Sequence, residues 1–192
     1  MLVCRASSNG QKTVYRDSWA DIAFIAMCRK AYGALAGWQS PRGWIEGKET
    51  FAGMVEVSRA LMKGRSAEQQ RDAVIAGFPK VPAWFRKVFP YSKWGAEVNA
   101  FITPAFFTWL VGPMKTIEVE ISKSDGQSVI QKSGVQIERC RYLEQSGCAA
   151  MCVNLCKSPC QTFFTEQLGM PLTMEPNFED SSCKVMIITN EP

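Results

Sequence analysis

The sequence predicts an α+β fold, in which a helical N-terminal half packs with a small antiparallel sheet that carries a cysteine-rich helix. Up to Gly112, apolar residues recur at helical spacing, whereas from Ile117 onward they alternate with polar residues at a period of two. Beyond these strands, cysteines recur every four residues, which is about one helical turn. With 192 residues, 46% of them hydrophobic, we expect a single domain over residues 15–192 after a flexible segment, 1–14.

The N-terminal segment and the charge distribution set limits on the function. Residues 1–11 lack acidic residues and include Ser7 and Ser8, which fits either the end of an organelle transit peptide or an unstructured N-terminus of any other origin. No run reaches the roughly 18 apolar residues that span a bilayer. The net charge of +4 does not by itself predict a nucleic-acid partner. Residues 1–96 carry 15 Lys/Arg against 7 Asp/Glu, which suits either an anionic membrane surface or a solvated helical exterior.

Three helices are expected in the first half of the chain as its scaffold. Asp17 or Ser18 can cap the first helix, which runs to about residue 36, and a second helix spans about 48–63 before Gly64. Ser66 and Gln69 form a capping box for a third helix that ends at residue 77. The expected apolar face of the first helix consists of Trp19, Ile22, Ala23, Ala26, Met27 and Ala34. That of the second consists of Phe51, Met54, Val55, Ser58, Leu61 and Met62.

Two aromatic segments follow these helices. In residues 79–89, aromatic and aliphatic side chains interleave with Lys80, Arg86 and Lys87, a pattern typical of a membrane-interface helix or of an ordinary core-facing one. Residues 94–112 are apolar on nearly every side, so we expect a buried core helix that Pro104 starts or kinks. Aromatic stacking on nucleic acid is a third interpretation of residues 79–89, but no other signature of nucleic-acid binding accompanies it, and we expect none.

The C-terminal half is expected to form strands. Alternation at 117–121 predicts a half-buried strand, Asp125-Gly126 predicts a hairpin, and the return strand runs to about residue 138 with a bulge at Gly134. Residues 171–180, with two prolines, are expected to form a loop, and residues 184–189 a final strand.

The cysteine-rich stretch suggests a metal site. Cys148, Cys152, Cys156 and Cys160 recur every four residues, and the chain has no histidine, so a transition metal would depend on thiolates, which suit iron–sulfur clusters or zinc. The spacing of the cysteines alone is consistent with a metal site, with buried free thiols and with disulfides. Because Cys148 and Cys156 lie about 12 Å apart along a straight helix, at least one ligand of a compact cluster would come from elsewhere, such as Cys140 or Cys183.

Several blocks of sequence resemble one family. They are E-R-C-R-Y-L-E-Q-S-G-C at 138–148, M-C-V-N-L-C-K at 151–157 and F-F-T-E-Q-L-G-M-P-L-T-M-E-P-N-F-E-D-S-S-C at 163–183. Upstream blocks are Y-R-D-S-W-A-D at 15–21 and S-K-W-G-A-E-V-N-A-F-I-T-P-A-F-F-T-W-L-V-G-P at 92–113. The chain resembles the plant beta-carotene isomerase family, the plastid family of the strigolactone dwarf-mutant isomerase, over most of residues 15–189.

The resemblance implies an iron-dependent chloroplast isomerase that interconverts all-trans-beta-carotene and its 9-cis isomer in strigolactone biosynthesis. The implied metal ligands are Cys140, Cys148, Cys152, Cys156 and Cys183. Of these, Cys148, Cys152, Cys156 and Cys183 are the first choice for holding the cofactor, iron or an iron–sulfur cluster. Cys160 departs from the family pattern, which has threonine after the proline, and Cys4 and Cys28 lie outside the motif.

The chemistry of a polyene agrees with this implication. Rotation about a double bond needs a temporary loss of π-bond order, through one electron, a proton or a Lewis acid. Without histidine, acid–base work falls to Glu, Asp, Tyr or Cys, whereas a thiolate-held cluster can pass one electron and take it back. Glu175 and Glu179, in the loop before Cys183, are candidates for groups that support the ligands. The expected substrate slot consists of Trp84, Phe85, Phe101, Phe106, Phe107 and Trp109.

The expected partners are therefore a carotenoid and, through residues 80–89, the surface of a plastid membrane. The alternative functions are a non-catalytic iron–sulfur protein that binds a carotenoid, an electron-transfer protein, and a structural protein of the membrane surface that carries thiols.

Overall fold

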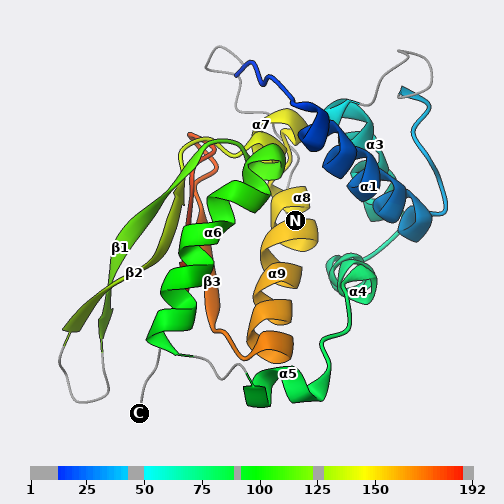
Figure 1. Cartoon of the computed structure of the whole chain (residues 1–192). Coiled ribbons are helices and arrows are strands. Elements are labelled where there is room, and N and C mark those ends of the chain that lie inside the picture. The colour runs from blue at the N-terminus through cyan, green and yellow to red at the C-terminus, as the bar shows by residue number, and fades with distance from the viewer. Residues whose placement is uncertain (1–12, 43–49, 89–91, 123–127, 188–192) are drawn as a thin grey trace. The chain divides into compact units, whose positions relative to one another are not determined.

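The computed structural model describes residues 13–42, 50–88, 92–122 and 128–187, and it confirms the α+β class (Figure 1). Contacts within the chain divide it into two compact units. The first unit contains the chain up to residue 78 together with 109–111 and 141–159. The second contains 79–108, 112–140 and the chain from 160 onward. Because the segments of the two units alternate along the chain, each unit is assembled from pieces that are distant in sequence.

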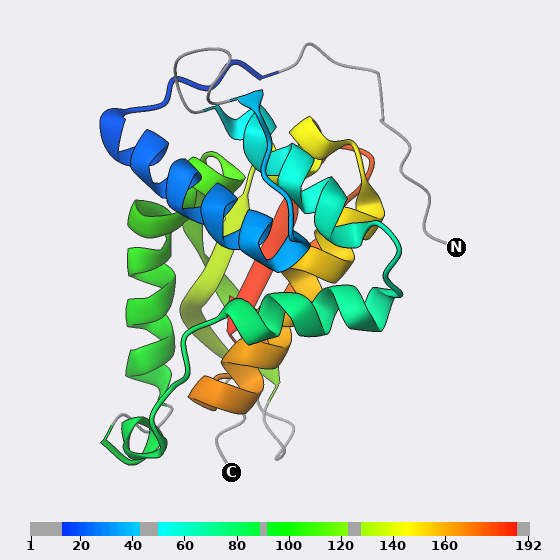
Figure 2. The same ribbon diagram turned by 90° about the vertical axis from the view of Figure 1, so that its right-hand side faces the viewer.

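The first unit is helical. Helices α1 (Trp19–Ala36) and α3 (Phe51–Met62) pack together, α4 (Ala67–Gly77) packs against both, and α7 (Arg141–Ser146) and α8 (Ala149–Cys152) contact α3 (Figure 2). The π-helical segment η1 (Val153–Lys157) follows α8 directly and contacts α4. The C-terminal cysteine motif therefore packs among helices from the start of the chain.

The helix boundaries of the first unit agree closely with the sequence prediction. Ser18 caps α1 in a capping box with Asp21, and Ser66 caps α4 in a capping box with Gln69. The start predicted for the second helix lies outside the described residues, whereas its predicted apolar face is mostly buried. The buried members of that face are Phe51, Met54, Val55, Ser58 and Leu61.

The predicted apolar face of α1 is wrong. Trp19 and Met27 are 85% and 58% exposed, and the helix instead turns Ile25, Arg29 and Gly33 inward. A Cβ atom at Gly33 would lie 2.1 Å from the side chain of Gln39, so the inward face is chosen by close approach rather than by hydrophobicity. The Arg29 guanidinium also donates a hydrogen bond to the Gln39 side chain at 3.0 Å, so the buried face includes a charged residue that sequence periodicity did not place there.

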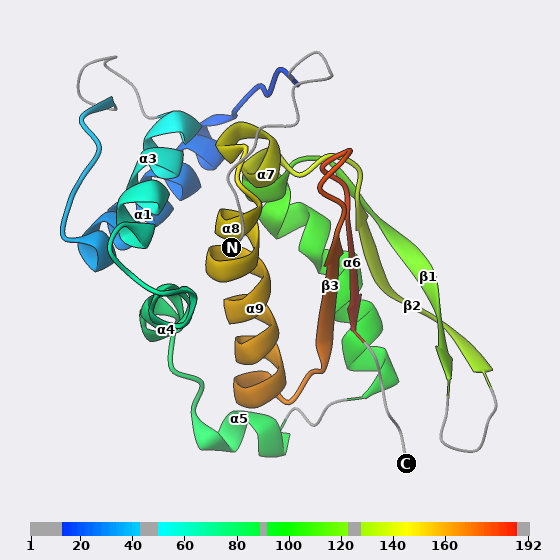
Figure 3. The ribbon, with the colours of Figure 1, turned by 180° about the vertical axis from the view of Figure 1, so that it is seen from behind.

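The second unit contains a four-stranded antiparallel sheet in the order β1-β2-β4-β3 (Figure 3). The strands are β1 (Met114–Ser122), β2 (Ser128–Ile137), β3 (Leu172–Pro176) and β4 (Cys183–Ile187). The helical elements of this unit are α5 (Ala83–Val88), most of α6 (Lys93–Val111), the end of α9 (Ser158–Thr162) and the π-helical segment η2 (Phe163–Leu168). The Thr116 side chain on β1 and the Lys132 backbone on β2 both hydrogen-bond α6, so this helix covers one side of the hairpin.

A bulge lies directly before Gly134, at residues 132–133, which confirms the bulge predicted there. Ile117 pairs with Gly134 and Val119 pairs with Gln131, so β2 has one extra residue between these two pairs. A Cβ atom at position 134 would lie 2.6 Å from Val119 Cγ1 and 2.8 Å from Ile117 Cγ1, which only glycine avoids. The predicted Asp125-Gly126 turn lies outside the described residues.

The loop predicted for residues 171–180 contains a strand that the sequence analysis missed. Leu172 and Met174 are buried on β3 and alternate with more exposed residues, and Pro176 ends the strand opposite Cys183. A proline is tolerated here because β3 is an edge strand whose outer amides are not needed for pairing. The last predicted strand is present as β4.

Among the described residues, α6 and α9 each contain a proline, which cannot donate the usual backbone hydrogen bond to the carbonyl four residues earlier. In both cases a side-chain hydroxyl donates to that carbonyl in its place. Pro104 in α6 has no amide hydrogen for the Ala100 carbonyl, and Thr116 Oγ1 donates to that oxygen at 3.1 Å. Pro159 in α9 likewise has no amide hydrogen to donate to the Leu155 carbonyl, four residues earlier. Tyr32 Oη donates to that carbonyl at 3.2 Å. The same replacement therefore stabilises α6 in the second unit and the cysteine helix of the first.

The expectation that α6 is buried on most sides is wrong. Trp94, Phe101 and Phe106 on α6 are 73%, 76% and 57% exposed, whereas Ala96 and Ala100 are fully buried. The helix thus packs through small residues, which allow a close approach to the sheet, and presents its large residues outward. No helix among the described residues combines the length and the apolar character needed to cross a membrane.

Candidate functional site

The structure divides the predicted cysteine ligands between the two units. Cys148, Cys152 and Cys156 belong to the first unit, and Cys140 and Cys183 belong to the second. Cys4 lies outside the described residues.

In the first unit the three cysteines do not form one straight helical stripe. Cys148 precedes α8 as its N-cap, with an extended backbone (φ −136°, ψ 105°), and its sulfur accepts a hydrogen bond from the Met151 amide at 3.4 Å. Cys152 is the last residue of α8 and is buried, and Cys156 lies in η1 and is half-buried. A π-helical turn closes over five residues rather than four, so the step from Cys152 to Cys156 does not complete a turn as the sequence spacing predicts.

The π-helical segment is held by polar contacts from two helices that precede it in the chain. Asn154 is buried and donates to the Gln70 side chain on α4 at 2.9 Å, and Gln70 in turn donates to the Met62 and Arg65 carbonyls. Together with the Tyr32 bond to the Leu155 carbonyl, these contacts hold the chain between Cys152 and Cys156. The path of the cysteine helix is therefore set by tertiary contacts.

Cys148 is disulfide-bonded in this structure. A disulfide sulfur is not a thiolate, and thiolate is the form in which cysteine binds iron or zinc. Within the described ranges, no group of three or more Cys, Asp or Glu side chains is arranged to hold a metal ion. The other four predicted ligands, Cys140, Cys152, Cys156 and Cys183, are not in disulfides, so their thiols can supply thiolates to iron or an iron–sulfur cluster.

In the second unit Cys140 and Cys183 lie at the same end of the sheet. Cys183 is the first residue of β4, opposite Ile137 of β2, and the Cys140 amide donates to the Ser181 carbonyl at 2.6 Å. Both cysteine side chains are buried, at 6% and 4% exposure, and both are reduced. The backbone thus brings together two of the five predicted ligands.

The cysteines outside the predicted set have different surroundings. Cys160 lies in α9 and is half-buried. Burial raises the pKa of the Cys28 thiol to about 11, so this thiol stays protonated near neutral pH and is a poor ligand and nucleophile.

A buried arginine next to the cysteines is the strongest polar feature of the first unit. Arg141, the first residue of α7, has 4% of its side chain exposed and forms a two-pronged ion pair with Asp17, with Nη2 2.8 Å from Oδ2. Its Nη1 also donates to the Trp109 carbonyl at 3.1 Å, and its guanidinium lies 4.1 Å from the ring centre of Phe51 and 4.7 Å from that of Tyr15. This role was not predicted, because its only signal in the sequence is one acidic and one basic residue in two separate family-like blocks.

The segment before α1 is bound to α7 at a second point. Glu144 accepts hydrogen bonds from the Thr13 amide, the Thr13 hydroxyl and the Tyr15 hydroxyl, at 3.0 to 3.1 Å. Arg59 on α3 also donates to the Ser146 carbonyl at the end of α7 at 2.9 Å. The block Y-R-D-S-W-A-D therefore packs directly on α7, the helix between Cys140 and Cys148 in the sequence.

The predicted substrate slot is largely a surface in this structure. Trp84, Phe101, Phe106 and Phe107 are 44–76% exposed. Trp109 belongs to the first unit, where it is 8% exposed and stacks on Phe24 with ring centres 5.7 Å apart. The remaining predicted residue, Phe85, is half-buried on α5.

The two glutamates predicted to support the ligands are exposed. Glu175 is on β3 opposite Lys184, and Glu179 lies in the turn before β4, where its amide donates to the Asn177 side chain. Neighbouring Asp180 has a lowered pKa because the backbone and side chain of Ser182 donate hydrogen bonds to it.

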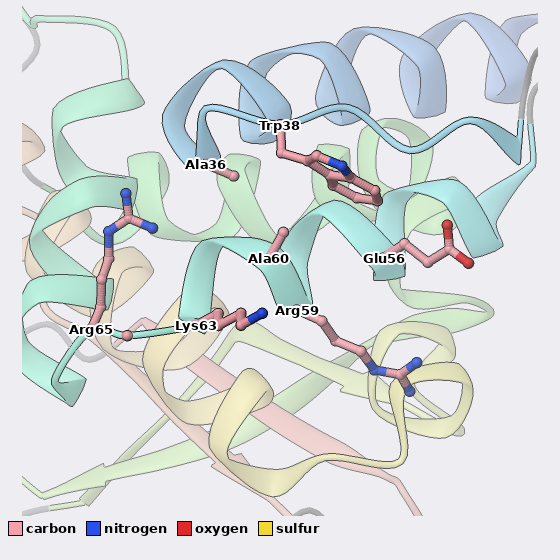
Figure 4. A pocket seen from close by; sticks show the side chains of 8 residues that line it. Ala36, Trp38, Glu56, Arg59, Ala60, Lys63 and Arg65 are labelled. Carbon is pink, nitrogen blue, oxygen red and sulfur yellow. The ribbon is translucent and has the colours of Figure 1, made fainter.

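The first unit also has an open hollow of about 800 Å³ at the C-terminal ends of α1 and α3 (Figure 4). It is lined by Ala36, Trp38, Glu56, Arg59, Ala60, Lys63, Gly64 and Arg65. Figure 4 shows the three cationic side chains pointing in different directions rather than converging. Arg65 donates to the Leu61 and Leu35 carbonyls, so its charge caps two helix ends.

A carboxylate in that hollow is strongly paired. Glu56 accepts hydrogen bonds from Ser40 Oγ at 2.5 Å and from the Arg42 guanidinium. Partial burial alone would raise the pKa of Glu56, but these hydrogen bonds and the charges of Arg42 and Arg59 lower it below its usual range. The group is therefore ionised near neutral pH and serves structure rather than proton transfer.

Comparison with known proteins identifies the family of the chain. Residues 109–192 match the family described as beta-carotene isomerase D27-like, C-terminal. The chain is 38% identical over 184 residues to chloroplastic beta-carotene isomerase D27 of Medicago truncatula, an alignment that covers 93% of this chain and 68% of that protein. The chain belongs to the beta-carotene isomerase D27-like family. The Arabidopsis thaliana protein of the same name is 37% identical over 144 residues, which are 72% of this chain and 53% of that protein.

Family membership confirms the resemblance predicted from the motifs. It also confirms the predicted class of enzyme, an isomerase, and the predicted plastid location, because both relatives are named chloroplastic. The chain spans about half the length of the Arabidopsis relative. No solved structure matches the chain.

Proposed function

We propose that this protein is a plastid carotenoid isomerase that converts all-trans-beta-carotene to 9-cis-beta-carotene, a reaction of strigolactone biosynthesis. The observation that carries the proposal is the 38% identity over 93% of the chain to a protein named beta-carotene isomerase. The matched family description also covers the whole stretch from Trp109 onward, including the predicted cysteine ligands.

The side chains of the second unit suit such a substrate. A carotene is a hydrocarbon without polar groups, so its binding depends on apolar contact rather than on hydrogen bonds. Aromatic side chains on α5 and α6 offer that contact, and Trp84, Phe101, Phe106 and Phe107 are accessible for it. An accessible aromatic surface admits a long, rigid molecule from a lipid phase more easily than an enclosed cavity does. We therefore keep these residues as the proposed substrate contacts.

The proposal includes iron bound by cysteine thiolates at Cys140, Cys148, Cys152, Cys156 and Cys183. What supports it is the donor chemistry of a chain with eight cysteines and no histidine, in which only sulfur is left as a soft ligand for a transition metal. When bound, iron or an iron–sulfur cluster supplies reversible one-electron or Lewis-acid chemistry to a polyene. Because Cys148 is disulfide-bonded in the structure, its use as a ligand requires reduction of that bond.

The activity is tested on purified protein with all-trans-beta-carotene in detergent, and the carotene isomers are separated by chromatography. We expect the 9-cis isomer to accumulate, and the same mixture to be approached when the reaction starts from 9-cis-beta-carotene. If carotene binds in fixed stoichiometry but the isomer ratio stays at that of a protein-free control, the chain is a carotenoid-binding protein. If it instead passes electrons to a partner and leaves the polyene unchanged, it is an electron-transfer protein.

Iron binding is tested separately, by measuring iron and acid-labile sulfide after anaerobic purification under reducing conditions. We expect Cys152→Ser to lose the metal, because residue 152 is a proposed ligand. Cys160→Ser is the matched control, since residue 160 is a nearby cysteine, in α9, outside the proposed set, and the variant should keep the metal. Equal amounts of iron and sulfide indicate a cluster, and iron without sulfide indicates a mononuclear site. Equal metal loss in both variants would contradict the proposed ligand set.

A further inference from the structure

The outward side of α6 is an unusually apolar surface. We define the α6 face as Trp94, Val98, Phe101, Ile102, Ala105 and Phe106. These positions fall on one side of a helix with 3.6 residues per turn. Trp94, Phe101, Ile102 and Phe106 are 73%, 76%, 41% and 57% exposed, and no charged residue is among the six.

The exposure of this face is not a by-product of poor packing. The opposite side of α6 is well packed within the second unit, where Ala96 and Ala100 are completely buried. Glu97 accepts a hydrogen bond from the Lys132 amide, and Thr116 donates to the Ala100 carbonyl. The helix is therefore fixed with its large residues outward, and an exposed apolar surface on a stable element marks a contact site.

The charge around the α6 face identifies the kind of partner. Residues 79–108 contain four Lys/Arg and one acidic residue, Glu97, which is half-buried and engaged by the Lys132 amide. Lys80, Arg86 and Lys93 are exposed. An apolar helix face with a basic surrounding and with tryptophan at its end is the composition of a helix that lies in the interface of an anionic lipid membrane.

We propose that the α6 face docks this protein on an anionic lipid surface, with α6 lying along the membrane rather than crossing it. A second copy of the chain is the less suitable occupant, because a two-fold contact would bring the same basic residues of both copies together. The proposal deepens the proposed function, since it names α6 as the contact through which a membrane-stored carotenoid is reached. It adds α6 to residues 80–89, the segment that the sequence predicts to meet the membrane.

The test is flotation of the purified protein with vesicles that contain no carotenoid, so that its result does not depend on isomerase activity. We expect binding to phosphatidylcholine vesicles with about one third phosphatidylglycerol, and at least tenfold weaker binding without the anionic lipid or in high salt. Phe101→Ser/Ile102→Ser should weaken binding to the anionic vesicles at least tenfold. Lys93→Glu should weaken it at low salt and have little effect at high salt.

Ile130→Ser is the matched control, because residue 130 is an exposed aliphatic residue (66%) of the same unit on β2, and it should bind like the wild type. Circular dichroism checks that the variants are folded. Should a variant fail to fold, quenching of wild-type tryptophan fluorescence by brominated lipid gives a second measurement, with Trp94 as the expected reporter. Equal binding of all variants, no binding by the wild type, or a dimer that Phe101→Ser/Ile102→Ser disperses would each overturn the proposal.

Discussion

The hydroxyl of Thr116 is expected to replace the hydrogen bond that Pro104 removes from α6, and this can be measured as a coupling energy. Thr116 Oγ1 is 3.1 Å from the Ala100 carbonyl oxygen, and Ala100 is fully buried. Thr116→Val keeps the shape of the side chain but leaves that carbonyl without its donor, which costs about 1–3 kcal/mol. In a chain of this size, each kcal/mol lowers Tm by about 2–4 °C.

The same Thr116→Val substitution is then made in a protein that carries Pro104→Ala. In that protein residue 104 regains an amide hydrogen, which can donate to the Ala100 carbonyl four positions earlier. In the Pro104→Ala protein, Thr116→Val should lower the free energy of unfolding by less than about 0.5 kcal/mol, because the Ala100 carbonyl accepts from the amide of residue 104. The coupling energy between the two substitutions should be about 1 kcal/mol or more. Urea unfolding of the four proteins gives these values, provided that m stays constant. Thr103→Val is the control. The Thr103 hydroxyl donates to the Asn99 carbonyl, but that carbonyl keeps a backbone amide donor four residues later when the hydroxyl is removed. Equal costs of Thr116→Val in both backgrounds would refute the replacement.

Three further predictions concern the first unit. Tyr32→Phe should destabilise the protein by about 1–3 kcal/mol in urea unfolding, because the Leu155 carbonyl before Pro159 loses its donor; an unchanged midpoint would contradict this. Asp17→Asn should lower the free energy of unfolding by about 3–5 kcal/mol, because it leaves the buried Arg141 charge without its carboxylate. A decrease below about 0.5 kcal/mol, as for an ordinary surface substitution, would show that the ion pair is dispensable. The lowered pKa of Glu56 means that its stabilisation is present above the unfolded-state pKa and is lost as pH falls through the folded-state pKa, so Glu56→Gln should lower stability near neutral pH and flatten the acid limb of the stability profile. Parallel acid limbs for the two proteins would oppose this assignment.

Local signals in the sequence predicted those parts of the fold that depend on neighbouring residues. The capping boxes at Ser18 and Ser66, the strand period and the bulge at Gly134 all follow from side chains within a few positions of one another. These features are local because hydrogen-bond geometry and φ preferences act over a few residues.

Sequence periodicity failed where two faces of a helix were both plausible. Residues 94–112 are apolar on nearly every side, so their pattern contains no information about which side meets the sheet. On α1 the buried face was decided by Gly33 and its contact with Gln39, which a hydrophobicity pattern does not register. The choice of face thus depended on close approach between distant segments.

The candidate site shows the same limit. Cysteines at every fourth position predict a stripe only if the helix is regular, and the π-helical turn at Val153–Lys157 removes that regularity. The irregular turn is accompanied by Pro159, Tyr32 and the buried pair Asn154–Gln70, which come from three parts of the chain. Tertiary contacts therefore decide where the sulfurs lie.

The family-like blocks of the sequence serve two separate purposes, and tests of the function must keep them apart. Asp17 binds Arg141, and Tyr15 binds Glu144. Part of the resemblance of residues 15–21 and 138–148 to the family therefore reflects the packing of these two segments on each other. A substitution of Arg141 that abolished activity would therefore say nothing about iron. Substitutions at Cys152 that preserve the ion pair with Asp17, confirmed by unchanged urea unfolding of the metal-free protein, isolate the chemical role of the sulfur from the structural role of its neighbours.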